Sequence, residues 1–180
     1  MWEMNPDGSN KKQISFLDGD VSDFKYFPDG SSVVLVKSVK LDQSVNDLYP
    51  DLPLANARLE TDLMYRHWDS WHDYTYNHLF IATYNETGIF DAKDIMPGER
   101  YDAPMKPFGG MEQISVSPDG KTIAYTCKKK TGMDYSFSTN SEIWLYDIST
   151  GKTKNLTEGI MGYDQNPVFS PDGKLIAWES

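Results

Sequence analysis

Short apolar segments recur along the chain, and each is followed by the turn Pro-Asp-Gly and a second strand-like segment. The three turns are Pro28–Gly30, Pro118–Gly120 and Pro171–Gly173. In such a turn proline presets φ at the first corner, aspartate can bond its own backbone, and glycine accepts the left-handed conformation. The second segments are rich in β-branched and aromatic residues, which favour strands. The pattern predicts three β-hairpins that repeat one structural unit.

A second kind of hairpin alternates with the first. Residues 142–147 form a period-two strand, which the turn at 149–152 joins to a short edge strand at 154–157. Residues 2–15 repeat this second hairpin around another Pro-Asp-Gly turn. Two hairpins make a unit of four antiparallel strands, which is the blade of a β-propeller. We therefore expect an all-β protein, a partial β-propeller of about three four-stranded antiparallel blades with a helical insertion.

The spacing of the turns divides residues 1–180 into pieces of one propeller domain. We assign 1–23 to the second hairpin of a blade, 24–113 and 114–166 to two blades, and 167–180 to the first hairpin of the next. Because propellers close with about 4–8 blades, these pieces predict an open arc and hence a fragment of a larger domain. The blade at 24–113 exceeds the roughly 40–50 residues of a simple blade, and its surplus lies at about 44–73.

This insertion shows apolar positions at helical spacing between residues 54 and 71. They recur every three to five residues, at Leu59, Leu63, Met64, Trp68 and Trp71. The spacing predicts an amphipathic helix of about four turns, with Pro53 near its first turn. The opposite face would carry Arg58, Asp62, Arg66, Asp69 and His72. On that face Asp62 and Arg66 would be close enough to pair.

Two interpretations of the insertion stay open. In the first, the helix plugs or flanks the propeller and its charged side chains are solvated. In the second, Glu60, Arg66 and Asp69 face a substrate chamber, where a carboxylate receives the α-amine of a peptide. Charge-assisted contacts of that kind are stronger than neutral hydrogen bonds. These three residues are the candidate substrate-binding residues of the chain.

Charge and hydropathy exclude two classes of partner. The chain has 17 Lys and Arg residues against 27 Asp and Glu residues, a formal net charge of −10. Nucleic acid is bound by clustered basic side chains, and the only basic run, Lys128–Lys130, stands alone, so no nucleic-acid partner is expected. No apolar run approaches the roughly 20 residues that a membrane-spanning helix needs, so no membrane span is expected. Residues 1–13 have no signal-peptide pattern.

Few side chains suggest chemistry of their own. The single cysteine, Cys127, alternates with apolar neighbours, which predicts a buried strand thiol. The histidines are five and six residues apart, on different helical faces, and no zinc-binding pattern is present, so we expect neither a metal nor a cofactor. The tryptophans at strand positions are expected to fill the space between sheets; they are Trp2, Trp144 and Trp178.

The Pro-Asp-Gly hairpins resemble the repeats of TolB-like propellers. The run Tyr49–Pro53 together with Leu63–Trp71 resembles a segment of bacterial dipeptidyl peptidase 5-like enzymes, which belong to the prolyl oligopeptidase family of serine peptidases. The resemblance covers essentially the whole chain. In that family an N-terminal propeller covers a C-terminal α/β-hydrolase domain, which holds the catalytic serine, aspartate and histidine. The propeller filters access and supplies part of the substrate pocket.

The resemblance implies a substrate-gating, non-catalytic portion of a periplasmic or secreted peptidase that removes short peptides from oligopeptide N-termini. Its partners would be the hydrolase domain of the same parent chain and the oligopeptide substrate. Some relatives bind the substrate amine with acidic residues of a propeller insertion, but this chain has no adjacent Glu-Glu pair.

The nucleophile motif Gly-x-Ser-x-Gly is absent from these residues, so they hold no catalytic residue and we expect the chain alone to be inactive. The alternative is a non-enzymatic TolB-like propeller that binds proteins of the cell envelope. The long insertion favours the peptidase, because a simple scaffold does not require it.

Overall fold

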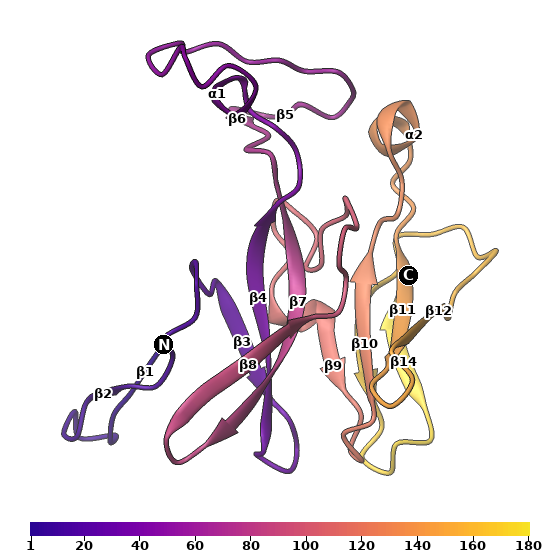
Figure 1. Ribbon diagram of the computed structural model, residues 1–180. Coiled ribbons are helices and arrows are strands. Elements are labelled where there is room, and N and C mark those ends of the chain that lie inside the picture. The colour runs from indigo at the N-terminus through magenta and orange to yellow at the C-terminus, as the bar shows by residue number, and fades with distance from the viewer.

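Two four-stranded antiparallel sheets form the body of the molecule (Figure 1). The computed structural model describes residues 1–180, and three two-stranded sheets complete its strands. Helix is limited to two short α-helices and one 3₁₀ turn, and no helix has the length and apolar character that crossing a bilayer requires. The all-β class expected from the sequence is confirmed.

The first four-stranded sheet has the strand order β3-β4-β7-β8. Its strands are β3 (Asp23–Tyr26), β4 (Ser32–Lys40), β7 (Thr75–Asn85) and β8 (Gly88–Asp94). Side chains alternate across a strand, so Val34 and Val36 of β4 enter the main core. Val33 and Leu35 enter a second core, shared with the N-terminal segment. This apolar run therefore belongs to a strand that is covered on both faces.

The second four-stranded sheet has the order β12-β11-β10-β9. Its strands are β9 (Ile114–Val116), β10 (Thr122–Cys127), β11 (Glu142–Asp147) and β12 (Lys152–Asn155). Hairpins precede and follow the two sheets: β1 (Trp2–Glu3) with β2 (Lys12–Gln13), and β13 (Gln165–Phe169) with β14 (Ile176–Glu179). Strand β13 packs against β9 and β10. The division of the chain after residues 23, 113 and 166 stays a prediction.

Polar side chains join successive sheets. Lys25 in β3 donates from Nζ to two backbone carbonyl oxygens, one of them that of Met111 at 2.8 Å. Met111 opens the 3₁₀ turn η1 (Met111–Gln113), which leads into β9. The Nε2 of Gln113 donates in turn to Oε1 of Gln165 in β13 at 3.2 Å. Three sheets are thus linked by hydrogen bonds near the first strand of each.

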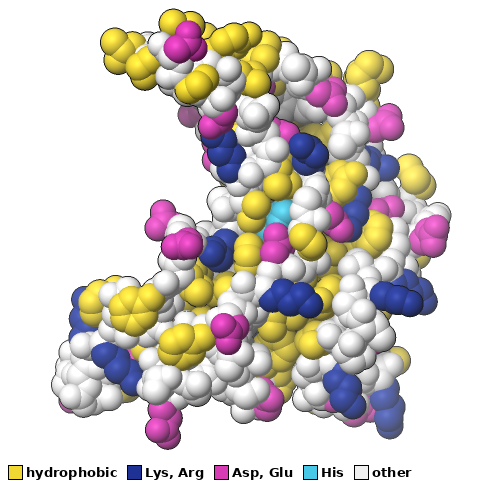
Figure 2. All heavy atoms as spheres, viewed as in Figure 1, with side chains coloured by type: hydrophobic (Ala, Val, Ile, Leu, Met, Phe, Trp, Pro, Cys, Tyr) yellow, Lys and Arg dark blue, Asp and Glu magenta, His cyan; other side chains and the backbone are white.

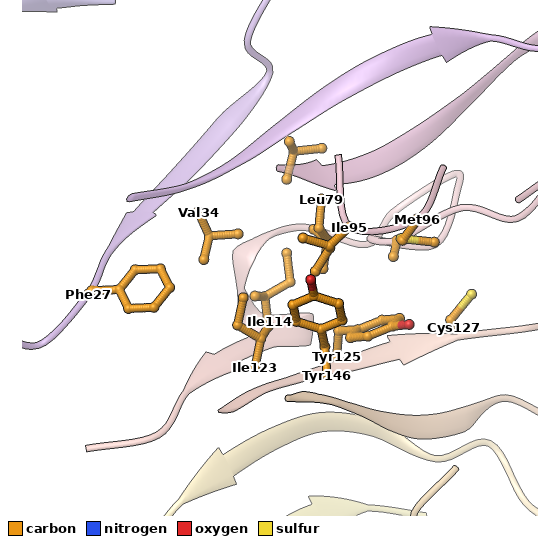
Figure 3. Packing of buried hydrophobic residues seen from close by; sticks show 12 residues of the cluster. Phe27, Val34, Leu79, Ile95, Met96, Ile114, Ile123, Tyr125, Cys127 and Tyr146 are labelled. Carbon is orange, nitrogen blue, oxygen red and sulfur yellow. The ribbon is translucent and has the colours of Figure 1, made fainter. Parts of the chain in front are cut away.

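The main core lies between the two four-stranded sheets (Figure 3). It contains 12 buried residues, Phe27, Leu79, Ile123, Tyr125 and Tyr146 among them. Cys127 belongs to this core with no exposed surface, so the predicted buried thiol is confirmed. Burial raises the pKa of the Cys127 thiol, which keeps it protonated at neutral pH.

The Pro-Asp-Gly turns that begin at Pro28, Pro118 and Pro171 share one geometry. In each turn the aspartate Oδ1 accepts the N–H two residues later, at 3.0 Å for Asp29 and 3.1 Å for both Asp119 and Asp172. The glycine that follows has a φ of +68°, +68° or +71°, the left-handed conformation that the motif predicts.

The connection between β4 and β7 contains the predicted insertion, but the four-turn helix predicted over residues 54–71 is wrong. The helical part is the single turn α1 (Val45–Leu48), which has a capping box formed by Ser44 and Asp47. Further along, β5 (Arg66–His67) and β6 (Ser70–Trp71) form a small hairpin.

Local contacts explain why the long helix does not form. A helix of this length is marginal unless its apolar face packs against the protein. Here Asp62 Oδ1 accepts the N–H of Leu63 at 2.8 Å, a local bond that competes with helical hydrogen bonding. Tyr65 stacks on Trp71, with ring centroids 6.1 Å apart, across the ends of the β5–β6 hairpin. The predicted Asp62–Arg66 ion pair is also wrong, because the helix that would align these residues is absent.

The expectation that three strand tryptophans fill the core is wrong for two of them. Trp2 is 60% exposed and Trp178 is 37% exposed. Both lie in two-stranded sheets, whereas Trp144 lies in a four-stranded sheet and packs against the main core. Burial of a strand side chain depends on a covering layer, which the alternation of residues within the strand does not reveal.

Candidate functional site

The two longest connections within a sheet leave from the same end of the molecule. They are residues 41–74, between β4 and β7, and residues 128–141, between β10 and β11, which include α2 (Gly132–Phe137). Antiparallel strands reverse direction at each connection, so these segments lie at the end opposite the Pro-Asp-Gly turns (Figure 1). We call the end that carries residues 41–74 and 128–141 the loop face.

One end of the insertion is tied to the connection between β8 and β9. Arg100 donates from Nε to Asp42 Oδ1 at 2.7 Å and from a terminal nitrogen to the Leu41 carbonyl oxygen at 3.3 Å. The hydroxyl of Tyr76 donates to the other oxygen of Asp42 at 2.7 Å. Burial opposes ionisation of Asp42, but the bonds from Arg100 and Tyr76 outweigh it and lower the pKa of the carboxyl.

The other end of the insertion is held by Lys106 from the same connection. Its Nζ donates to the Thr75 carbonyl oxygen at 2.9 Å and lies 3.6 Å from Asp73 Oδ1 and 3.5 Å from Asp102 Oδ1. Asp102 also accepts the N–H of Asn77 at 2.8 Å, and burial raises the pKa of its carboxyl. Both ends of the insertion are therefore anchored, which fixes where its outer part lies.

Aromatic rings organise the outer part of the insertion. Trp68 stands at the turn of the β5–β6 hairpin with a φ of +51°. Its indole contacts the ring of Phe108, 5.1 Å away between centroids, and the imidazole of His67, 4.9 Å away. Trp68 remains 67% exposed. The hairpin is thus docked through Trp68 on the residues that follow Lys106, with an indole left facing solvent.

Two arginines contact the ring of Trp71. The guanidinium carbons of Arg58 and Arg66 lie 5.2 and 5.1 Å from the centroid of that ring. Arg58 also lies over Tyr74 at 5.1 Å and donates from Nε to Glu60 Oε1 at 2.8 Å. Cation–π contacts of this kind hold the guanidinium groups in place against the hairpin.

The structure separates the three predicted site residues. No hydrogen bond or ion pair joins any two of Glu60, Arg66 and Asp69. Glu60 is engaged by Arg58, whose guanidinium lies over the same Trp71 ring that Arg66 contacts. Asp69 is exposed in the hairpin turn, where its Oδ1 accepts the Ser70 hydroxyl at 3.3 Å.

Three residues outside the insertion position it and were not predicted from the sequence: Arg100, Lys106 and Phe108. All three belong to the connection between β8 and β9, which carries no motif. The one available signal is its length, because connections beyond about 12–15 residues without regular structure are uncommon and are often functional.

A groove of about 500 Å³ opens beside the hairpin. It is lined by Leu63, Met64, Tyr65, Arg66 and Trp68. Hydrophobic side chains gather over this end of the molecule (Figure 2). An open groove lined by four hydrophobic residues and one basic group can hold an apolar side chain and orient a polar group attached to it.

No family model matches the chain. It is 52% identical over 162 residues to dipeptidyl-peptidase 5 of Porphyromonas gingivalis, covering 90% of this chain and 24% of that protein. It is 46% identical over 173 residues to dipeptidyl-peptidase 5 of Porphyromonas endodontalis, covering 96% of this chain and 25% of that protein.

A solved structure of TolB from Agrobacterium tumefaciens aligns with 98% of this chain and 45% of that one, with a TM-score of 0.55 and 16% identity. This likeness concerns the fold alone. The chain spans about a quarter of the length of its two curated relatives. Both resemblances drawn from the sequence, to TolB-like repeats and to dipeptidyl peptidase 5-like proteins, are confirmed.

Proposed function

This chain is homologous to about one quarter of dipeptidyl-peptidase 5 and has TolB-like propeller blades, and from that premise we propose that it is the non-catalytic, substrate-gating part of a peptidase. The peptidase removes short peptides from the N-termini of oligopeptides, in the periplasm or outside the cell. The similarity of 52% over 162 residues carries the proposal. A match that covers 96% of the chain also includes most of the insertion.

We place the catalytic partner, an α/β-hydrolase domain of the same parent chain, against the loop face. Large apolar side chains are exposed there, including Leu54 at 95%, Met133 at 64% and Phe137 at 82%. Exposed apolar groups that gather on one face mark an interaction surface. The opposite end presents Pro-Asp-Gly turns whose aspartates bond to nearby backbone N–H groups.

Substrate recognition is assigned to the outer part of the insertion. Of the two candidate carboxylates, Glu60 is engaged by Arg58, whereas Asp69 is exposed and accepts only a weak hydroxyl bond. Asp69 is therefore the group that we assign to the α-amine of the oligopeptide, since an ammonium and a carboxylate form a charge-assisted contact.

The direct test uses the complete protein with unblocked oligopeptides and identifies the products by mass spectrometry. We expect dipeptides released from the N-terminus. No hydrolysis, together with a reading frame that holds further Pro-Asp-Gly blades and no Gly-x-Ser-x-Gly motif, contradicts the peptidase and leaves the TolB-like binding propeller.

The role of Asp69 is tested by Asp69→Asn in the complete protein, with Asp51→Asn as the matched control. Asp51 is an exposed carboxylate of the same insertion and takes part in no hydrogen bond or ion pair. We expect kcat/KM for unblocked peptides to fall about tenfold in Asp69→Asn only, which corresponds to the loss of one charge-assisted contact. An equal effect of the two substitutions contradicts the assignment.

A further inference from the structure

One arginine of the chain has no acidic partner. The arginines are Arg58, Arg66 and Arg100. Arg58 pairs with Glu60 and Arg100 pairs with Asp42, each through Nε. Arg66 takes part in no salt bridge, although the chain has a net charge of −10 and many carboxylates. Its positive charge is therefore available to a ligand.

The surroundings of Arg66 hold its guanidinium in position. It lies over the ring of Trp71, which also stacks on Tyr65, so the group contacts a braced surface. A guanidinium over a ring contacts it through its flat face, and the N–H donors around its edge stay available. An immobilised guanidinium loses less entropy when it binds than a freely moving one.

Nearby carboxylates of the insertion do not compete for Arg66. Glu60 is bound by Arg58. Asp62 accepts the N–H of Leu63 and faces Gly132 of α2, where a Cβ would lie 2.9 Å from its Oδ1. Asp69 accepts the hydroxyl of Ser70 across the turn. None of these three residues lines the groove.

We propose that the groove binds the carboxylate of a peptide on Arg66 and an adjacent apolar side chain on Leu63, Tyr65 and Trp68. The planar donor edge of a guanidinium matches the two oxygens of a carboxylate, and no other charged side chain lines the groove. The carboxylate comes from the C-terminus of a short peptide or from an acidic side chain. This inference rests on the proposed function, because it gives the oligopeptide a second point of contact besides its amine.

The test measures binding of three N-acetylated peptides to the complete protein by calorimetry. The first is N-acetyl-Ala-Leu-Phe as the free acid, the second its C-terminal amide, and the third N-acetyl-Ala-Glu-Phe amide. All three lack the α-amine, so binding does not depend on dipeptide release. We expect the free acid to bind about tenfold more tightly than its amide at low salt and less so at high salt.

The third peptide distinguishes the two sources of the carboxylate. If it binds like the free acid, an acidic side chain suffices. If it binds like the amide, the groove requires the C-terminal carboxylate. Equal affinity for all three peptides overturns the proposal.

Substitutions in the complete protein test which residues cause the difference in affinity between the free acid and the amide. Arg66→Gln should abolish the difference between acid and amide, Arg66→Lys should retain part of it, and Trp68→Ala should weaken all three peptides about equally. Lys154→Gln, on exposed β12, removes the same charge elsewhere and should change nothing. Circular dichroism checks that each variant is folded.

An acid-to-amide ratio that is unchanged in Arg66→Gln, or that changes as much in Lys154→Gln, overturns the assignment of Arg66. The peptidase proposal and the groove proposal can fail independently. Peptides that bind the groove of a protein without hydrolytic activity contradict only the peptidase proposal. Hydrolysis of unblocked peptides by a protein whose groove binds no peptide contradicts only the groove proposal.

Discussion

Replacing Asp94 by asparagine should destabilise the protein through the buried imidazole of His78. His78 has no exposed surface. Its Nδ1 lies 2.8 Å from Asp94 Oδ2, and its Nε2 lies 2.7 Å from the carbonyl oxygen of Glu99. Both partners accept hydrogen bonds, and a neutral imidazole has only one N–H to donate. Only the protonated ring can donate to both partners, so these contacts favour the cation.

The size of the effect follows from what asparagine retains. Removing one partner of a fully buried ion pair costs about 3–5 kcal/mol. The side chain of Asp94 is 21% exposed, and asparagine keeps an oxygen that can accept the N–H of Met96, now bonded at 2.7 Å. We therefore expect Asp94→Asn to lower the free energy of unfolding by about 2 kcal/mol at neutral pH.

The pH dependence gives a sharper signature. Burial lowers the pKa of His78, but the hydrogen bonds to Asp94 and the Glu99 carbonyl, with the negative charges of both residues, outweigh it and raise the pKa. Lys129, which pairs with the Glu99 carboxylate, is the other charged group nearby. When folding raises the pKa of a histidine, its protonated form stabilises the folded state fully at pH values below the unfolded pKa of about 6.5. This contribution to stability is lost as the pH rises through the pKa of the folded state.

Urea unfolding followed by tryptophan fluorescence, at intervals from about pH 5.5 to pH 9, tests both effects. The wild-type protein should lose stability above about pH 6.5, and Asp94→Asn should lose less over the same interval. Asp91→Asn is the control, because Asp91 is exposed in the same strand and its φ of +54° suits asparagine. Equal pH profiles for the wild-type protein and Asp94→Asn would refute the cationic pair.

Two further predictions concern the links between elements. Lys25→Met removes the Nζ donor to the carbonyl oxygens of Met111 and Ile114, of which the first keeps the Ile114 N–H. It should lower the free energy of unfolding by about 1–3 kcal/mol in urea unfolding, whereas Lys93→Met, at an exposed position of β8, should have little effect. Gly88→Ala places a Cβ 2.5 Å from the Ile14 carbonyl oxygen and should make the N-terminal hairpin sensitive to limited proteolysis. Gly159→Ala should leave the cleavage pattern unchanged, because Gly159 also has a positive φ, of +82°, but has open space around it.

The repeated hairpins could be predicted because their causes are local. A Pro-Asp-Gly turn needs only the conformational limits of three residues and one aspartate bond, and Asp29 and Asp119 make that bond at nearly the same length. Strand alternation also acts over a few residues, so the strands and the buried Cys127 followed from the sequence. The resemblance to dipeptidyl peptidase 5-like proteins rested on residues near each other in the chain, including the run Leu63–Trp71.

The candidate site was only partly predictable. The sequence indicated a functional insertion and Arg66 as one of its candidate residues. The helical spacing of its apolar residues predicted a helix, whereas the structure has a hairpin there. The position of that hairpin depends on Arg100, Lys106 and Phe108, which lie some distance away in the sequence. Likewise, Trp2 has the pattern of a core residue and is exposed.

Turn chemistry and strand alternation are therefore determined by the sequence itself, because steric limits and local hydrogen bonds act between near neighbours. The path of the insertion, the free charge of Arg66 and the protonation of His78 are decided by tertiary structure. Burial and charge pairing depend on which distant groups the fold brings within a few ångströms, and no local pattern contains that information.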